Sequence, residues 1–494
     1  MKRPMFYSHA VSAALRSARM RHLAGLIGLA ALSGCSGFIP NFVRPALPVA
    51  THIGAAPSAS APVSTPVSPP ASLAAALSLQ HSPFATDPDL KSLLDLALAH
   101  NRDLRVAVLN IELAQAQWGV RQADLLPNVN LGVGGSRQTT ASGALTSSYS
   151  AGLSLPAIPA YELDLFSRLR NLSEAARSQY LASEEARKTV QMGLMASIAN
   201  TWLAWQSDAA LLALTEKTLT SREATVKLLQ LRFDQGASSL LDLRAAQSLL
   251  EAARIARTQL QRQQAQDESA LTLLLGQPLP AVLKSRAGLA GDAVQPLRWT
   301  EFPANLPSEV LLKRPDVAQA ELQMLAANAN IGAARAAFFP KITLTSSLGR
   351  ASTDLGQLFQ SGTLGWSFGA QILQPIFDAG RNESNLKIAQ ANRAIAQAQY
   401  EKTVQTAFKE VSDALSARDT LKAQWDAQAA QAQSETDRSR LAQLRFKQGS
   451  SSYLDVLDAE RSLFSAQQAL IQVQTQYAQN TVTLFRALGG GWAP

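Results

Sequence analysis

The chain carries the stretch LRFDQGASSLLD at residues 231–242 and a near copy, LRFKQGSSSYLD, at residues 444–455. The two stretches lie 213 positions apart, and the same offset aligns other residues, such as Pro127 with Pro340 and Gly276 with Gly489. One register kept over so long a span indicates an internal duplication. Each copy combines long helical patterns with short alternating strands, which suits a conduit through a membrane.

The two copies share one plan. In the first, residues 89–277, we expect a helix over 89–125, strands at about 128–139 and 149–163, and two long helices on either side of Gly236. In the second, residues 308–490, we expect a helix from Pro315, strands at about 341–350 and 364–374, and two long helices on either side of Gly449. A proline-marked linker over residues 278–307 separates the copies.

The helical patterns predict slender helices rather than large globular cores. A helix of about 65 residues spans on the order of 100 Å, which exceeds what a compact domain needs. Aromatic residues make up only 6% of the chain, so little apolar area is available to fill a wide core. Within the last long pair, Val404, Phe408, Val411 and Leu415 follow the spacing of a coiled-coil seam.

The strands are about ten residues long and have two unlike faces. In the last one, Leu364, Trp366, Phe368 and Ile372 alternate with glycine, serine and glutamine. This pattern is typical of a membrane-spanning barrel strand, although a half-buried sheet in a soluble domain also alternates. Four strands per chain cannot close a barrel, and open edges are not tolerated in lipid. A barrel therefore requires several copies of the chain.

The first 34 residues predict a secretory signal. A basic stretch is followed by an apolar run over 23–32 that is too short to span a bilayer, and then by small residues before Cys35. The Leu-Ser-Gly-Cys sequence resembles the bacterial lipoprotein box, which implies a lipid on Cys35 and, with Ser36 next, sorting to the outer membrane. An ordinary signal with an incidental cysteine is the alternative. Residues 35–88, rich in Pro, Ala and Ser, predict a tether.

Composition and motifs argue against enzymatic and nucleic-acid-binding classes. Five basic and no acidic residues precede Cys35, so the charge falls from +8 to +3 without the leader, and no basic patch suggests nucleic acid. Beyond the leader, the histidines are His52, His81 and His100, without metal-ligand spacing. We expect neither an enzyme nor a metal, and no cofactor apart from the covalent lipid on Cys35.

Several motifs resemble those of TolC-like outer-membrane efflux proteins, in the lipidated NodT-type branch of tripartite multidrug efflux systems. They are ELDLF at 162–166, KRPD at 313–316, FFP at 338–340, PIFDAGR at 375–381 and YLDVLDAER at 453–461. The resemblance implies a mainly α fold with a transmembrane β part. In it, a homotrimer forms an outer-membrane β-barrel, with four strands from each chain, that continues into a periplasmic α-barrel. The implied partners are a periplasmic adaptor (membrane fusion protein) and an inner-membrane transporter.

The resemblance also assigns residues to the periplasmic end. It implies that the breaks at Gly236 and Gly449 are the hairpin tips that contact the adaptor. It places the periplasmic entrance, or gate, at Asp455, Asp458, Asp242 and Arg244, where clustered carboxylates would select cations and raise one another's pKa. The alternative is that these carboxylates simply begin a helix. Ser451 stands where some members carry an arginine that locks the entrance.

The predicted function is a passive outer-membrane exit channel that conducts drugs or other small toxic solutes out of a Gram-negative cell. Two alternatives remain at this point. One is the exit channel of a one-step protein secretion system, which has the same shape. The other is a periplasmic coiled-coil lipoprotein without a channel, which would require the strands to form a soluble sheet.

Overall fold

The computed structural model describes residues 38–53, 84, 87–141, 143, 145–155, 160–283 and 306–490. The predicted signal peptide and Cys35 lie outside these residues, as do most of the predicted linker and much of the predicted tether. The chain divides into two compact units. The first comprises residues up to 45, 112–182 and 321–399, and the second comprises residues 46–111, 183–320 and 400 onward. The predicted mainly α fold with a β part is confirmed.

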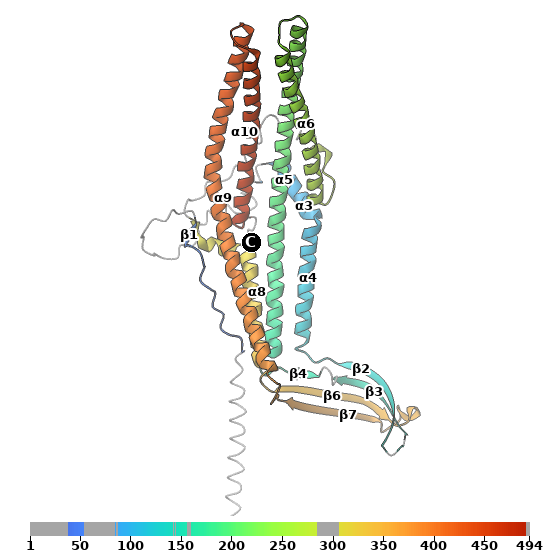
Figure 1. The fold of residues 1–494 in the computed structure, drawn as a ribbon. Coiled ribbons are helices and arrows are strands. Elements are labelled where there is room, and N and C mark those ends of the chain that lie inside the picture. Colours follow the sequence, from blue (N-terminus) through green and yellow to red (C-terminus); the bar gives the residue numbers. More distant parts are fainter. Residues whose placement is uncertain are drawn as a thin grey trace, which may run out of the picture. The chain divides into compact units, whose positions relative to one another are not determined.

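The first unit contains a curled antiparallel sheet (Figure 1). Its long strands are β2 (Asn130–Thr139), β3 (Leu145–Leu155), β6 (Lys341–Ser352) and β7 (Leu364–Leu373), in the order β2-β3-β6-β7. The short strand β4 (Tyr161–Leu163) pairs with β6 next to the β3 segment. β2 and β7 form the two edges of the sheet.

The single strand predicted over residues 149–163 is wrong. β3 ends at Leu155 and β4 begins at Tyr161, and both pair with β6. Pro156 and Pro159 lie between them in the sequence. Residues 156–159 lie outside the described part of the chain.

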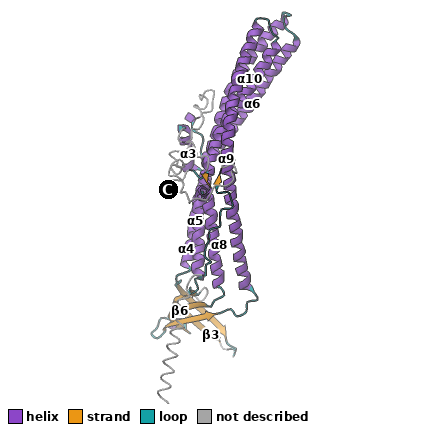
Figure 2. Ribbon diagram, turned by 90° about the vertical axis from the view of Figure 1, so that its left-hand side faces the viewer, coloured by secondary structure: helices purple, strands orange, loops and turns teal. Residues whose placement is uncertain are grey.

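The second unit contains two helical hairpins (Figures 1 and 2). One pairs the C-terminal part of α5 (Arg168–Asp234) with α6 (Leu240–Leu275), and the other pairs α9 (Arg381–Lys447) with α10 (Tyr453–Ala487). Of the predicted seam on α9, Val404, Val411 and Leu415 are buried, whereas Phe408 is half-buried. None of the helices described is long and apolar enough to cross a membrane.

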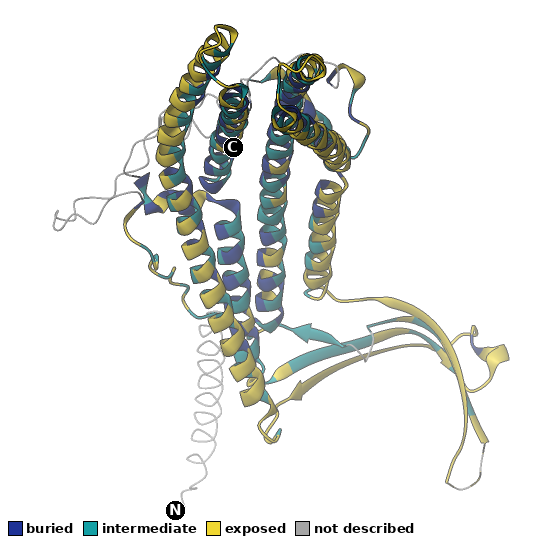
Figure 3. Cartoon of the chain, turned by 45° about the horizontal axis from the view of Figure 1, so that its top comes forward, coloured by how far each residue is buried: buried dark blue, intermediate teal, exposed yellow. Residues whose placement is uncertain are grey.

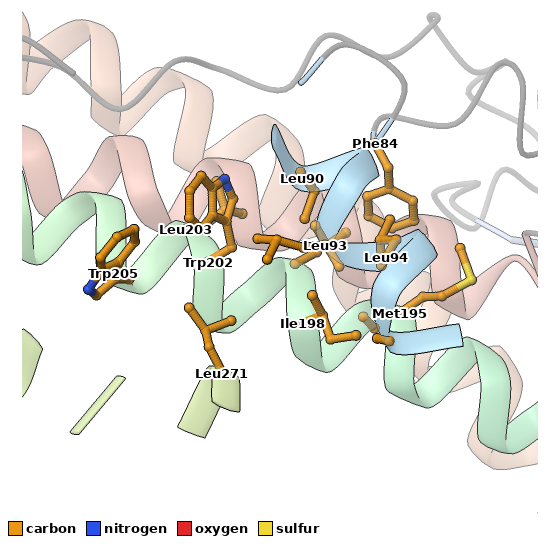
Figure 4. Close-up of a cluster of buried hydrophobic side chains, with 14 of the residues drawn as sticks. Phe84, Leu90, Leu93, Leu94, Met195, Ile198, Trp202, Leu203, Trp205 and Leu271 are labelled. Carbon is orange, nitrogen blue, oxygen red and sulfur yellow. The ribbon is translucent and has the colours of Figure 1, made fainter. Parts of the chain in front are cut away.

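The main apolar core of the second unit surrounds α3 (Pro88–His100), as Figure 4 shows. Leu90 and Leu93 of α3 are fully buried together with Trp202 of α5 and Leu271 of α6. The Trp202 Nε1–H donates to Asp87 Oδ2 at 2.9 Å, while Asp87 Oδ1 caps the first turn of α3. The same aspartate therefore begins α3 and attaches it to α5.

The single helix predicted over residues 89–125 is also wrong, because α3 is followed by a separate helix, α4 (Arg102–Ala123). Asn101 between them is extended, its Oδ1 accepts from the Leu104 amide, and its Nδ2 donates to the Leu274 carbonyl at 2.8 Å. The second copy repeats this break. Arg314, the counterpart of Asn101, is also extended and donates to the carbonyl of Ala487, the counterpart of Leu274.

The α8 helix (Pro315–Ala336) follows Arg314 and a 3-10 turn, η3 (Ser308–Lys313). In the first unit, part of the predicted tether lies against α8. Asn328 Nδ2 donates to the Pro40 carbonyl at 2.8 Å, and Arg44 forms an ion pair with Glu321 at 2.7 Å. The tether prediction is therefore wrong for residues 38–45, because α8 supplies partners for their backbone and charge.

The tether prediction also fails for residues 50–53, which lie in the second unit. There β1 (His52–Ile53) pairs with β5 (Leu306–Pro307), and the Ser308 hydroxyl donates to the Ala50 carbonyl. Ile53 is fully buried. The tether prediction thus applies only to residues outside the described part of the chain.

Candidate channel wall and entrance

The sheet of the first unit separates apolar from polar side chains. Residues directly opposite one another in a ladder share a face. One cross-strand row consists of Leu131, Leu153, Leu348 and Trp366. The next row on the same face consists of Val133, Ala151, Arg350 and Leu364, of which Arg350 is the charged member. The other face carries mainly glycine and small polar residues, including the row Asn130, Ser154, Ser347 and Ser367.

Strands β2 and β7 are exposed along their whole length in the single chain (Figure 3). Leu131 is 77% exposed and Trp366 is 78% exposed. In a soluble domain the apolar face would be packed against a core, so the half-buried soluble sheet is disfavoured. A mainly apolar face opposite a polar, glycine-rich face is the arrangement of a membrane-spanning channel wall.

One row of the polar face consists entirely of glycine. Gly132, Gly152, Gly349 and Gly365 lie opposite one another across the four long strands. A Cβ on Gly349 would lie 2.6 Å from the Ala151 carbonyl oxygen, and one on Gly152 would meet the backbone of β6. A Cβ on Gly132 or Gly365 would meet nothing within 4 Å. The close approach of β3 and β6 therefore requires glycine only at the two inner positions.

An ion-paired cluster connects the base of the sheet to α5. Glu162, of the ELDLF motif, accepts two hydrogen bonds from Arg168 at 2.8 and 2.7 Å and pairs with Lys341 of β6 at 3.0 Å. The Glu162 side chain is only 10% exposed. Bidentate pairs of this kind fix geometry as well as charge, so the cluster joins β4, β6 and the start of α5.

Three aromatic rings hold the N-terminal segment beside this cluster. Phe38 stacks on Phe339 at a centroid distance of 4.6 Å, and Phe166 stacks on the same ring at 4.9 Å. Gly332 leaves room for Ile39, since a Cβ there would lie 2.8 Å from the Ile39 side chain. The segment that follows Cys35 is thus attached at the FFP motif.

Each hairpin of the second unit turns at one of the two predicted glycines. Gly236 and Gly449 have left-handed φ values of 71° and 73°, which glycine adopts without strain. The two tips expose the same leucines at equivalent positions of the duplication, namely Leu228 and Leu441, Leu231 and Leu444, and Leu241 and Leu454.

Two of the predicted gate residues cap helices. Ser452 and Asp455 form a capping box at the start of α10, in which each side chain accepts the other's backbone N–H. Ser239 and Asp242 make a related contact at the start of α6, where the serine hydroxyl donates to Asp242 Oδ2 at 2.7 Å. Asp242 and Asp455 therefore lie in the first turns of their helices, and a gating role for them stays a prediction.

The other predicted gate residues make contacts within their own hairpins. Asp458 pairs with Arg438 of α9 at 2.5 Å and with Arg461 at 2.7 Å. The hydrogen bond from Arg438 lowers the pKa of Asp458, whereas carboxylate clustering would raise it. Arg244 donates to Gln247 at 2.8 Å. The single chain therefore does not bring the four predicted residues together.

The contact between the two hairpins uses a face of α10 that sequence reasoning missed. Tyr453, Leu457, Glu460 and Phe464 follow a 4, 3, 4 spacing, which places them on one side of the helix. Leu457 packs in an apolar cluster with residues of α5 and α6, and the Tyr453 hydroxyl is hydrogen-bonded to Thr225 of α5. Asp455 and Asp458 lie on another side of α10. The 4, 3, 4 spacing from Tyr453 to Phe464 was the sequence signal that could have predicted this interface.

Aromatic contacts extend this interface toward the tips. The guanidinium of Arg232 on α5 lies 5.0 Å from the ring centroid of Phe446 on α9. Phe446 in turn contacts Tyr453 edge-on at 4.9 Å. Cations stack favourably on aromatic faces, so this contact joins the repeat-one hairpin to the repeat-two hairpin.

The KRPD motif has a structural role that its sequence did not reveal. The Arg314 side chain is 6% exposed and pairs with Asp316 and with Glu410 of α9, both at 2.8 Å. Burial lowers the pKa of Arg314, but the hydrogen bonds to Asp316 and Glu410 outweigh it and the pKa is raised. Arg314 thus joins α8, α9 and the end of α10 within the second unit.

The described residues contain no group of three or more His, Cys, Asp or Glu side chains that could hold a metal ion. What the geometry provides instead is an apolar wall, a glycine-lined polar face and two helical hairpins.

Comparison with known proteins identifies the family. The profile of the outer membrane efflux protein family matches residues 93–277 and 306–490, one match for each copy of the duplication. The chain belongs to the outer membrane efflux protein family. It is 44% identical to a probable efflux pump outer membrane protein, TtgC of Pseudomonas putida, over 93% of each chain.

Solved outer membrane channels share the fold. A membrane protein from Pseudomonas aeruginosa aligns with a TM-score of 0.81 and 39% identity, covering 92% of this chain and 98% of that one. The open state of the MtrE channel of Neisseria gonorrhoeae aligns with a TM-score of 0.76 and 34% identity, covering 92% and 98%. This outer membrane efflux protein is therefore a channel protein of the outer membrane and not an enzyme.

Proposed function

We propose that this protein is the outer-membrane exit channel of a tripartite pump and passively conducts small toxic organic solutes out of the cell. The sheet carries the argument, because its mainly apolar outer face and polar, glycine-rich inner face suit a wall between lipid and an aqueous path. Relatives at 42–44% identity are named for antibiotic, toluene and solvent efflux pumps, which supports small organic molecules as the substrate class.

The channel is a homotrimer. Within the described part of the chain, strands β2 and β7 each pair along one edge only. An open edge is not tolerated in lipid. Three copies would supply twelve long strands, enough to close a barrel. Exposure of the apolar sheet face in the single chain fits this arrangement, since outer-membrane lipid would then cover that face.

The hairpin tips form the periplasmic end. Gly236 and Gly449 turn the chain there, and the leucines exposed at equivalent positions of both tips offer a repeated apolar surface to the periplasmic adaptor. The adaptor connects the channel to the inner-membrane transporter. The entrance, or gate, is formed by Asp455 and Asp458, with Asp242 and Arg244 in a lesser role. The hydroxyl of Ser451 is buried and has no hydrogen-bond partner among the residues that the structure describes. It carries no charge, so it cannot supply the ionic lock of an arginine.

Accumulation of dyes and antibiotics in a deletion strain tests this function. Restoring the gene should lower the accumulation of at least one compound, because the exit step of the pump is then complete. A matched strain that expresses the inner-membrane transporter and adaptor alone is the control. If accumulation does not change although the protein reaches the outer membrane, protein secretion becomes the better reading.

Cys35 is the proposed attachment point of the N-terminal lipid. Cys35→Ala should abolish incorporation of radiolabelled palmitate, because the chain then has no cysteine, while Ser36→Ala should retain the label. Efflux should persist in part, since Phe38 and Pro40 are still held by contacts with Phe339 and Asn328. Label that remains after Cys35→Ala would contradict the assignment.

A further inference from the structure

Arg222 is a buried cation between three helices at the contact of the two hairpins. It lies on α5 and is 5% exposed. Its Nη1 donates to the carbonyl oxygen of Leu249 on α6 at 2.7 Å, and its Cζ lies 5.2 Å from the ring centroid of Phe464 on α10. Its Nε is buried and has no hydrogen-bond partner among the described residues.

The charge of Arg222 is only partly compensated, in contrast to that of Arg314, which has two carboxylates at 2.8 Å. No carboxylate of the described residues lies within ion-pairing distance of Arg222. The Glu460 carboxylate attracts the Arg222 guanidinium from beyond ion-pairing distance. Its Oε1 accepts a hydrogen bond from Gln443 of α9 at 3.1 Å. Burial accordingly lowers the pKa of Arg222 and raises that of Glu460.

A second copy of the chain cannot supply the missing acceptor without rearrangement. The Arg222 Nε is already enclosed in the single chain, so atoms of a neighbouring copy would not reach it. The Leu249 carbonyl and the Phe464 ring are therefore the principal compensation in this arrangement. Water would solvate the guanidinium if α10 moved away from α5 and α6.

A buried charge whose desolvation is incompletely offset can destabilise an interface, and an apolar residue of similar volume often makes the same interface more stable. From this contact geometry we infer that Arg222 keeps the two hairpins of each chain weakly joined and so lowers the free energy needed to open the periplasmic entrance. This inference rests on the proposed function. Arg222 acts as a positioning residue, because its contacts with Leu249 and Phe464 set how the two hairpins meet.

Replacing Arg222 by Met tests the direction of this effect. Arg222→Met fills the same space without charge, so the joined arrangement should become more stable and the fraction of time that purified trimers stay open in planar bilayers should fall by about tenfold. Arg222→Gln removes the charge but keeps a donor for the Leu249 carbonyl, and should act in the same direction. Arg254→Met removes an exposed arginine of α6 that pairs with Glu251 of the same helix and with Glu223 of α5, within one hairpin. Exposed pairs contribute little, and this pair does not join the two hairpins, so the open fraction should stay unchanged.

The sign of the result decides between two roles. If Arg222 instead clamps the hairpins together, Arg222→Met and Arg222→Gln will increase the open fraction, which overturns the inference, as does an unchanged open fraction. Heat-resistant trimers on a gel confirm that each variant has assembled before it is measured. Wild-type trimers that conduct no current under any condition would contradict the channel function itself, which separates failure of that proposal from failure of this one.

Discussion

Gly152→Val should abolish the assembled channel, whereas Gly132→Val should leave it nearly intact. Both glycines lie in the same cross-strand row. A Cβ on Gly152 would lie 2.5 Å from the Leu348 carbonyl oxygen and would also meet the Gly349 Cα. Both obstacles are backbone atoms, so no change of rotamer relieves the clash. Overpacking costs about 1–3 kcal/mol even where side chains can adjust, and this site offers less freedom.

The expected consequence is loss of the β3–β6 pairing. A one-residue slip in register would exchange the apolar and polar faces, which the membrane does not tolerate. Valine itself is favourable in strands, and a Cβ on Gly132 meets nothing within 4 Å, so the second variant is a matched control. The yield of heat-resistant trimers in outer-membrane fractions is the measurement. Equal yields of the two variants would show that β3 and β6 do not require the close approach.

Asp455→Ala combined with Asp458→Ala should raise the conductance of the channel in planar bilayers. Asp455 accepts the Ser452 backbone N–H in the capping box, so alanine removes this half of the box in each chain while Ser452 still caps α10. Asp458 joins α9 to α10 through Arg438. Since about 1.4 kcal/mol changes an equilibrium tenfold, three altered chains should increase leak conductance by about tenfold or more.

Two further variants separate charge from capping in this experiment. Asp455→Asn with Asp458→Asn keeps acceptor oxygens but removes both charges, so a leak in this variant would indicate an electrostatic gate. Asp426→Ala removes an exposed carboxylate of α9 that pairs with Lys422 in an ordinary surface pair, and should not change conductance. Conductance that stays at the wild-type level in the double alanine variant would remove Asp455 and Asp458 from the gate.

Local patterns predicted the elements well where they depend on local chemistry. The strand alternation predicted which side chains share a face, and Gly236 and Gly449 marked the two hairpin turns. The prediction of one helix over 89–125 was wrong. The local pattern allows a helix through Asn101, but the hydrogen bonds of its side chain with Leu104 and Leu274 stabilise a break there. The second partner, Leu274, is distant in the sequence, so a local reading could not include it.

The site was predicted less completely than the fold. The gate assignment of Asp242, Asp455 and Asp458 came from the resemblance to TolC-like efflux proteins, and their gating role stays a prediction. The contact between hairpins instead uses Tyr453, Leu457 and Phe464, whose seam spacing is visible in the sequence but whose partners on α5 and α6 are not. Arg222 looks like an ordinary surface arginine on a long helix, and only packing shows that it is buried.

The sequence by itself determined the duplication, the helix-and-strand plan of each copy and the two unlike faces of the strands, because these follow from periodicity and backbone chemistry within short windows. Only the tertiary structure decided that Gly152 and Gly349 face each other across the sheet, that α8 holds residues 38–45, and that Arg222 lies among α5, α6 and α10 without a paired carboxylate. Those features depend on which distant segments of the chain come into contact. The burial of a side chain and the compensation of its charge are defined only by such contacts.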